Sequence, residues 1–273
     1  MVITFDGLLR RTDLAVRFTK MLQLLEKHYH SPVDTEFTVH IEDPTTPNPE
    51  VKISLLQCRP QSHLQESDAH LPANLPADDI VFSTERMAPQ GRVSGIRYVV
   101  FVSPKEYFSL PTLSARGELG RAIGRLNTAL ANETFICIGP GRWGTNNPDL
   151  GVSISYADIY NSKALVEITG QGIGVSPEAS FGTHFFQDLV ESNIYPLAVY
   201  LNDHDVIFKD DFFFSTPNKL GDFLPAEKSK GDVLRLIEVA SYRPDYHLEL
   251  VMDDNQGIAA AFLDSDKPDP DIY

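Results

Sequence analysis

The sequence lacks the features that mark a membrane or a secreted protein. It has no apolar run of about 18 residues, roughly the length that a helix needs to cross a bilayer. Charged residues between Asp6 and Asp13 interrupt any apolar core near the N-terminus, so no signal peptide is expected. There are only two cysteines, Cys58 and Cys137, and each lies inside an apolar run. We therefore expect a cytoplasmic protein whose thiols are free and buried.

Basic residues are also scarce. Lys and Arg number 23 against 38 Asp and Glu, which gives a formal net charge of −15. Such a field repels nucleic-acid backbones and anionic membrane surfaces, so neither is an expected partner. A small phosphorylated ligand remains compatible with this charge, because a local pocket can be basic while the rest of the surface is acidic.

Several catalytic motifs are absent as well. The sequence contains neither G-x-x-x-x-G-K-[ST] nor G-x-S-x-G, so P-loop and α/β-hydrolase chemistry have no basis in it. The eight histidines show no metal-binding spacing. Neither cysteine has a histidine-based activation pattern, so a nucleophilic thiol is not supported.

Hydrophobic periodicity predicts a mixed α/β or α+β chain. An apolar stripe at helical spacing runs from Leu14 to Tyr29, and two strand-like runs follow it. The segments that we expect to be regular are helices at 14–29, 113–130, 184–192 and 227–239, strands at 34–43, 51–58, 92–102, 134–138, 164–168 and 194–201, a hairpin into 206–214, and a final hairpin at 247–263.

Composition divides the chain into a short first segment and a larger second one. We expect residues 1–62 to form one domain and residues 63–92, which prolines interrupt, to form a linker. Residues 93–263 are expected to form an α/β domain. The acidic segment 264–273 is predicted to be disordered.

The two predicted strands near the N-terminus carry polar groups that suit a metal ion and phosphates. If they pair as a hairpin, Asp34 and Glu36 lie beside Gln57 and Arg59. Carboxylate and amide oxygens are hard ligands for Mg²⁺, and a guanidinium holds polyphosphate in a bidentate manner. From the residues alone, a charged edge pair without any ligand explains the same spacing.

The stretch SPVDTEFTVHIED followed by KISLLQCRP resembles the closing segment of the ATP-grasp nucleotide-binding domain of phosphoenolpyruvate synthase and pyruvate phosphate dikinase. In that family a D-x-E-[WF] strand and an L-Q-x-R-P strand surround the metal and the phosphates of ATP. The resemblance covers roughly residues 1–62 and implies that Glu36 and Gln57 hold Mg²⁺. By the same resemblance, Asp34 supports these ligands and Arg59 steadies the phosphates, so that Mg²⁺ and ATP are the implied cofactors of a kinase-like phosphotransferase.

The earlier part of that domain, which holds the adenine pocket, has no counterpart in this sequence. The phosphoenolpyruvate-binding barrel of the family also has no counterpart in this sequence. We therefore expect the C-terminal part of a longer phosphotransferase, in which a missing ATP-grasp lobe completes the nucleotide site in cis or in trans. A remnant that no longer phosphorylates anything fits the same pattern.

His184 is the candidate phosphoryl acceptor. It opens a helical stretch in GTHFFQDL, and a helix N-terminus favours anions. The order of strand, glycine-rich loop, G-T-H, helix and proline-containing strand is loosely similar to the swivelling phosphohistidine domain of the same enzymes, although Phe185 and Phe186 replace small residues there. The alternative is a histidine that is buried in the core and whose ring nitrogens have hydrogen-bond partners.

A glycine-rich loop, GPGRWG, follows the apolar run TFICI. It fits G-x-G-x-x-G, but the next residues, TNNPDLG, form turns and start no helix, so a dinucleotide site is not predicted. Gly139, Gly141 and Gly144 allow the backbone to approach an anion that Arg142 can hold. The alternative is a tight turn in which Arg142 pairs with an internal carboxylate while Trp143 packs.

The leading hypothesis is the C-terminal portion of a phosphotransferase similar to phosphoenolpyruvate synthase and pyruvate phosphate dikinase. Its expected ligand is a nucleotide or a phosphorylated small molecule. The rival hypothesis is a non-catalytic module that binds a phosphorylated metabolite through Arg142, or binds a protein partner. A purely structural remnant is the third, and it predicts that Arg142→Ala and His184→Ala change no binding.

Overall fold

The computed structural model describes residues 6–30, 33–47, 49–60, 69–86, 90–170, 180 and 183–267. The chain divides into two compact units, unit 1 (Met1–Ser62) and unit 2 (His63–Tyr273). No helix in the described ranges is both long enough and apolar enough to cross a lipid bilayer.

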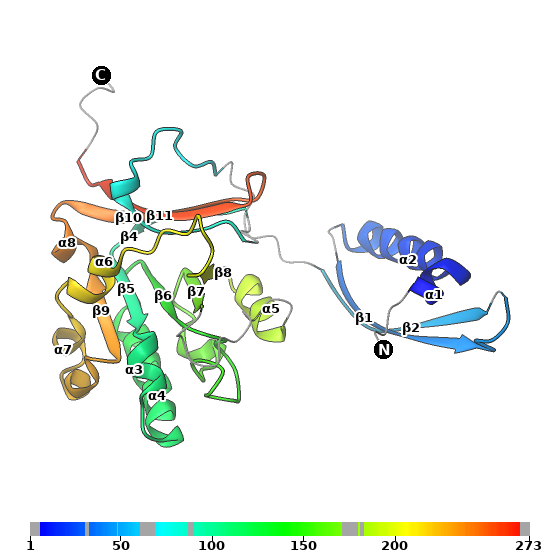
Figure 1. Cartoon of the computed structure of the whole chain (residues 1–273), viewed down its shortest axis with the longest axis horizontal. Helices are drawn as coiled ribbons and strands as arrows, with labels where there is room; N and C mark the ends of the chain where they lie inside the picture. The colour runs from blue at the N-terminus through cyan, green and yellow to red at the C-terminus, as the bar shows by residue number, and fades with distance from the viewer. Residues whose placement is uncertain are drawn as a thin grey trace. The chain divides into compact units, whose positions relative to one another are not determined.

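Unit 1 places two helices against a two-stranded hairpin (Figure 1). Helices α1 (Asp6–Arg11) and α2 (Leu14–Tyr29) precede strands β1 (Val33–Glu42) and β2 (Glu50–Pro60), which pair antiparallel. The helix predicted from the apolar stripe and the two predicted strands are confirmed.

Unit 1 has little interior. Among its described residues, only Leu14, Pro49 and Val51 are buried. A two-stranded sheet is at best marginally stable by itself, so this unit gains little from its own packing. Large apolar side chains remain exposed on all four of its elements, namely Leu9, Val16, Leu24, Tyr29, Phe37, Leu55 and Leu56.

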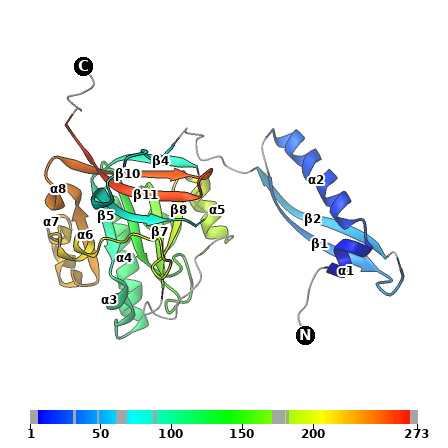
Figure 2. The same cartoon turned by 45° about the horizontal axis from the view of Figure 1, so that its top comes forward.

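Unit 2 contains two sheets, which Figure 2 shows as separate layers. One is antiparallel with the strand order β3-β11-β10-β4. The other has the order β8-β7-β6-β5-β9, in which β5 to β8 run parallel and β9 is antiparallel to β5. The strands are β3 (Ile80–Thr84), β4 (Gly91–Ile96), β5 (Tyr98–Val102), β6 (Phe135–Pro140), β7 (Ala164–Thr169), β8 (Tyr195–Tyr200), β9 (Leu234–Glu238), β10 (Tyr246–Asp253) and β11 (Ile258–Ser265).

Helices and 3₁₀ turns connect these strands. The longest is α4, which Thr112 caps by accepting a hydrogen bond from the backbone N–H of Ala115 at 3.2 Å. The helices are α3 (Pro104–Phe108), α4 (Leu113–Ala129), α5 (His184–Glu191), α6 (Asp210–Ser215), α7 (Leu220–Phe223) and α8 (Val239–Tyr242), and the 3₁₀ turns are Ala77–Asp79, Tyr156–Asp158 and Pro225–Lys230.

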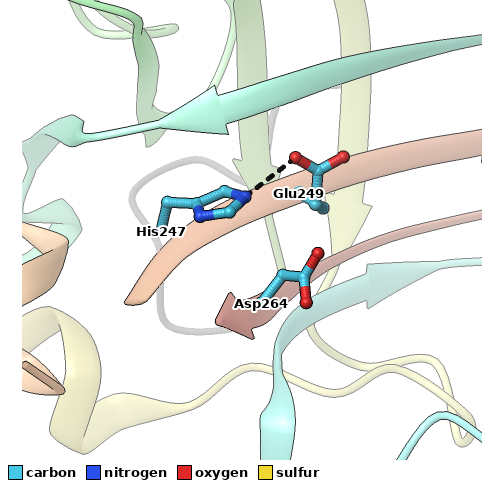
Figure 3. A group of neighbouring side chains, drawn as sticks. All are labelled: His247, Glu249 and Asp264. Atoms are coloured by element: carbon cyan, nitrogen blue, oxygen red, sulfur yellow. Dashed lines mark hydrogen bonds and ion pairs between the residues drawn. The ribbon is translucent and has the colours of Figure 1, made fainter. Parts of the chain in front are cut away.

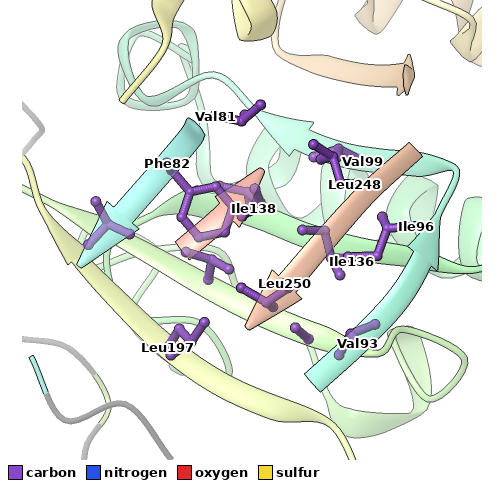
Figure 4. Packing of buried hydrophobic residues seen from close by; sticks show 14 of the residues in the cluster. Val81, Phe82, Val93, Ile96, Val99, Ile136, Ile138, Leu197, Leu248 and Leu250 are labelled. Atoms are coloured by element: carbon purple, nitrogen blue, oxygen red, sulfur yellow. The ribbon is translucent and has the colours of Figure 1, made fainter. Parts of the chain in front are cut away.

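Two hydrophobic clusters define three layers. One cluster fills the space between the two sheets, where Ile138 of β6 and Leu250 of β10 are fully buried (Figure 4). The other packs the opposite face of the five-stranded sheet against α4 and α5, and it includes Leu126 and Cys137. Burial raises the pKa of the Cys137 thiol to about 12, which keeps it protonated and inert. The predicted mixed α/β fold class is confirmed.

Four predicted segments differ from the structure. The single strand predicted at 92–102 is two strands, β4 and β5, which belong to different sheets. Residues 80–84 were expected within a linker but form the edge strand β3. The helix predicted at 227–239 is wrong, because residues 234–238 form β9 and pair with β5. The strand predicted at 206–214 is also wrong, since α6 occupies its second half. A short apolar run fits a helix or a strand equally well. Here pairing with strands that are distant in the sequence determines which one forms.

The predicted disordered tail begins inside regular structure. Strand β11 continues to Ser265, and Asp266 then pairs with Arg97 at 2.5 Å and with His247 at 2.6 Å. These contacts hold the start of the segment against the sheet. Residues 268–273 lie outside the described residues.

Candidate functional site

The antiparallel register of β1 and β2 brings the four predicted metal and phosphate ligands together. Asp34 lies opposite Arg59, and Glu36 lies opposite Gln57. Directly opposite residues share a face of a β-ribbon, and so do residues two apart on one strand. The two carboxylates, the amide and the guanidinium therefore share one face, and a bulge after Glu36 ends this regular stretch.

Gln57 and Arg59 also contact each other along β2. In the amide orientation that satisfies both groups, Oε1 of Gln57 accepts hydrogen bonds from Nη2 of Arg59 at 2.8 Å and from its Nε. Asp34 and Glu36 are exposed, whereas Gln57 and Arg59 are half-buried. The ribbon thus presents two accessible carboxylates beside a guanidinium that a neighbour already orients.

The carboxylate and amide oxygens of this group are the type of ligand that Mg²⁺ binds. In nucleotide sites Mg²⁺ is usually held by one or two carboxylates and by phosphate oxygens, and it keeps several waters. Glu36 offers an exposed carboxylate, and Asp34 offers a second one on the same face. The amide oxygen of Gln57 faces Arg59, so it must turn away from that guanidinium to reach a metal ion.

The GPGRWG loop at the end of β6 is shaped by close packing. Gly141 and Gly144 have φ of +66° and +69°, the left-handed region that favours glycine. A Cβ at Gly139 would lie 2.6 Å from the buried ring of Trp143, and one at Gly144 would lie 2.5 Å from the ring of Phe185 on α5. The tight-turn interpretation accounts for these glycines. No helix starts in the residues after the loop, as expected.

A buried glutamate anchors the loop to the sheet. Glu167 of β7 is 0% exposed and accepts hydrogen bonds from the backbone N–H of Trp143 at 2.7 Å and from the N–H and Oγ of Ser180 at 2.6 and 2.7 Å. Burial raises its pKa to about 7, against the opposing effects of those hydrogen bonds and of the Arg142 charge. We did not predict Glu167, although one acid inside the apolar run ALVEI was the available signal.

Arg142 is half-buried in the same loop. Its charge lowers the pKa of Glu167, the internal carboxylate nearest to the predicted pairing, but no direct ion pair joins the two side chains. The Nε of Arg142 is buried and has no hydrogen-bond partner among the described residues. A buried N–H without a partner is costly, so this atom is a donor that a ligand oxygen can satisfy.

His184 is the first residue of α5, as predicted. Oγ1 of Thr183 caps the helix by accepting a hydrogen bond from the backbone N–H of Phe186 at 3.4 Å. The imidazole is exposed, and its Nδ1 lies 3.3 Å from Oε1 of Gln187. The alternative of a core histidine is wrong, because Phe186 enters the core instead. Gly182 of the G-T-H motif lies outside the described residues.

A further polar cluster lies on the antiparallel sheet of unit 2 (Figure 3). Ligand-type atoms of His247, Glu249 and Asp264 lie within 4.8 Å of one another. Sequence spacing did not reveal this group, because Asp264 joins it through cross-strand pairing with His247. Glu249 already accepts hydrogen bonds from Oγ of Ser94 at 2.8 Å and from the N–H of Gly95 at 2.9 Å. These donors stabilise the carboxylate without a metal ion.

Comparison with protein families adds information on the first part of the chain. Residues 11–76 match the family model described as pyruvate phosphate dikinase, AMP/ATP-binding domain. The matched segment contains α2, β1 and β2, and it ends before β3. This similarity supports a nucleotide-binding segment of a phosphotransferase type, as the sequence motifs implied. Neither a curated protein nor a solved structure matches the chain.

Proposed function

We propose that unit 1 forms the phosphate-facing end of a magnesium–nucleotide site in a phosphotransferase similar to phosphoenolpyruvate synthase. The observation that carries the proposal is the β1–β2 register, which sets Asp34 opposite Arg59 and Glu36 opposite Gln57. These residues lie within the segment that is similar to an AMP/ATP-binding domain. Carboxylates beside a guanidinium form the charge pattern that a metal-bound polyphosphate requires.

Each of the four residues has a separate role in this site. Glu36 and Gln57 hold Mg²⁺, and Asp34 supports them from the same face. Arg59 donates to the phosphates, since its planar fork matches two phosphate oxygens. When bound, Mg²⁺ neutralises charge on the phosphates. The residues of unit 1 therefore bind and orient the nucleotide.

A further lobe completes the site in cis or in trans. The exposed apolar side chains on every element of unit 1 support this part of the proposal, as does the small number of buried residues among those described. Apolar surface on this scale is typical of an element that packs against another one. The chain then supplies the C-terminal, closing portion of a larger phosphotransferase.

Calorimetric titration with Mg·ATP tests the proposal. We expect weak, saturable binding to the wild-type chain that becomes at least tenfold weaker in Glu36→Gln, because a metal ligand is lost. Glu50→Gln is the matched control, since Glu50 is an exposed acid at the opposite end of the same hairpin. Equal affinities of the two variants, or no binding to the wild-type chain at 10 mM nucleotide, would contradict a site in this chain.

A second candidate function belongs to a different class, a non-catalytic module that holds a phosphorylated metabolite through Arg142. The buried Nε of Arg142, which lacks a hydrogen-bond partner in the described part of the chain, favours it. Titration with phosphoenolpyruvate should show binding that Arg142→Gln abolishes. The control Arg121→Gln, which alters an exposed arginine on α4, should retain it. Unchanged binding in Arg142→Gln would count against the module.

Within the phosphotransferase proposal, His184 is the phosphoryl acceptor. The exposed imidazole at the first residue of α5 supports this role. Incubation with Mg·[γ-³²P]ATP should place acid-labile label on the wild-type chain and on His204→Asn, a variant of another exposed histidine. Label that persists in His184→Asn would exclude the role.

A further inference from the structure

A pocket of about 470 Å³ lies in unit 2 at the amino ends of three parallel strands. Thr134 and Lys163 immediately precede β6 and β7, and Asn193 lies two residues before β8. Because the amino ends of adjacent parallel strands meet at one edge of a sheet, residues distant in the sequence come together here. Edge strand β4 adds Arg92 and Ser94 to the lining.

This pocket is separate from the GPGRWG loop and from the β1–β2 hairpin, although Arg92 and Ser94 also contact Glu249 of the polar cluster on the antiparallel sheet. Arg142 follows the carboxyl end of β6, at the opposite edge of the same sheet. The pocket also lies within unit 2, so it involves none of the predicted nucleotide ligands on the β1–β2 hairpin.

The lining of the pocket has two cations and no carboxylate. In a chain with a net charge of −15, this is a local reversal of sign. The side chain of Lys163 is exposed and forms no ion pair with any described residue. Hydroxyl groups of Thr134 and Tyr195 and the amide of Asn193 add neutral donors to the lining. Cations with neutral donors are the groups that bind phosphate oxygens.

Arg92 keeps donors for a ligand although a carboxylate lies behind it. Its Nη1 is 3.9 Å from Oε2 of Glu249, too far for a hydrogen bond. That carboxylate already accepts hydrogen bonds from Ser94 and Gly95, and it lies 3.1 Å from Nε2 of His247. Glu249 thus orients the guanidinium without satisfying its N–H groups, and the Arg92 side chain is 45% exposed.

Tyr195 fixes one part of the pocket lining in place. A Cβ at Gly91 would lie 2.3 Å from the ring of Tyr195, so the tyrosine packs directly on the backbone of β4. The pocket is therefore formed before any ligand binds, and its volume falls within the range of about 300–1,000 Å³ that is typical of small-molecule sites.

We propose that this pocket binds a small phosphorylated molecule, with Lys163 and Arg92 holding the phosphate group and with Thr134 and Asn193 completing its hydrogen bonds. The site does not depend on nucleotide binding by unit 1.

Nuclear magnetic resonance titration with inorganic phosphate, at an ionic strength held constant with sodium chloride, tests this site in the full-length chain. We expect saturable shifts of the amide signals of Ser94, Thr134 and Asn193. The dissociation constant should rise at least fivefold in Lys163→Gln and in Arg92→Gln. The control Lys105→Gln, which alters an exposed lysine on α3, should bind like the wild-type chain.

Three outcomes would overturn the proposal. The first is that no amide signal around the pocket responds to phosphate. The second is that Lys163→Gln and Arg92→Gln bind phosphate as tightly as the wild-type chain does. The third is that Arg142→Gln alone abolishes binding, which would assign the phosphate to the GPGRWG loop instead.

Discussion

A single carboxylate ties the GPGRWG loop to the five-stranded sheet. Glu167 is buried in β7 and accepts hydrogen bonds from Trp143 and from Ser180, on two separate segments. Its pKa rises to about 7 in the folded chain, above the ordinary value of 4.5. Between these two values the unfolded chain releases the proton while the folded chain keeps it. The contribution of Glu167 to stability is thus complete below pH 4.5 and is lost as the pH rises toward 7.

The pH dependence of unfolding tests this carboxylate. Relative to Glu167→Gln, the wild-type chain should lose free energy of unfolding on the order of 3 kcal/mol as the pH rises from about 4.5 to about 7. Urea unfolding followed by the fluorescence of Trp143, the one tryptophan in the sequence, measures it. Glu118→Gln, at an exposed site on α4, should show no such difference. A difference that is flat with pH would show that Glu167 has an ordinary pKa.

Two glycines should respond to substitution in opposite directions. Gly144→Ala should destabilise the chain by more than about 1 kcal/mol, because it forces a side chain into positive φ and against Phe185. Gly117→Ala should stabilise it by about 0.5–1 kcal/mol, since Gly117 lies inside α4 with open space around it. Thermal unfolding of the two variants measures the sign of each change in stability. A neutral Gly144→Ala would mean that the loop adapts without cost.

At the scale of elements, the β1–β2 hairpin depends on packing that the described part of unit 1 does not supply. Its amide hydrogens should exchange with solvent roughly two orders of magnitude faster than those of β5 to β7, which lie between two hydrophobic clusters. Hydrogen exchange followed by mass spectrometry measures this contrast. Protection of β1 and β2 equal to that of β6 would show that the hairpin is stable without further partners.

The elements that the sequence predicted well are those with strong local patterns. The apolar stripe from Leu14 to Tyr29 requires a helix, and alternation in DTEFTVHIED requires a strand. Strands β3 and β9 escaped prediction because each is five residues long and is defined by pairing with β11 or β5. A short apolar segment carries no information about its distant partner.

The same distinction applies to the candidate sites. The D-T-E and Q-C-R motifs predicted the grouping of Asp34, Glu36, Gln57 and Arg59, because a hairpin pairs nearby segments. Glu167, Ser180 and the pocket around Lys163 required knowledge of the sheet order, since they join residues from separate strands. The sequence left two roles open for Arg142, binding an anion or stabilising a tight turn. Its role in anion binding remains a proposal.

At the scale of the whole molecule, the two units differ in family similarity, in packing and in charge. Unit 1 contains most of the segment that is similar to an AMP/ATP-binding domain, and it has little interior of its own in the described residues. Unit 2 has layered cores and almost all of the net negative charge, with a local basic pocket. We thus propose that unit 1 binds nucleotide phosphates and that unit 2 binds a separate phosphorylated ligand.

The central claim is that the β1–β2 hairpin holds a metal-bound nucleotide, and paramagnetic broadening by Mn²⁺·ATP tests it most directly, because it locates even a weakly bound metal. We expect substoichiometric Mn²⁺·ATP to broaden the amide signals of residues 34–36 and 57–59 and to spare Glu50 at the far end of the hairpin. Excess Mg·ATP should reverse the effect. Broadening centred on Glu249 and Asp264 instead, or none at all, would contradict it.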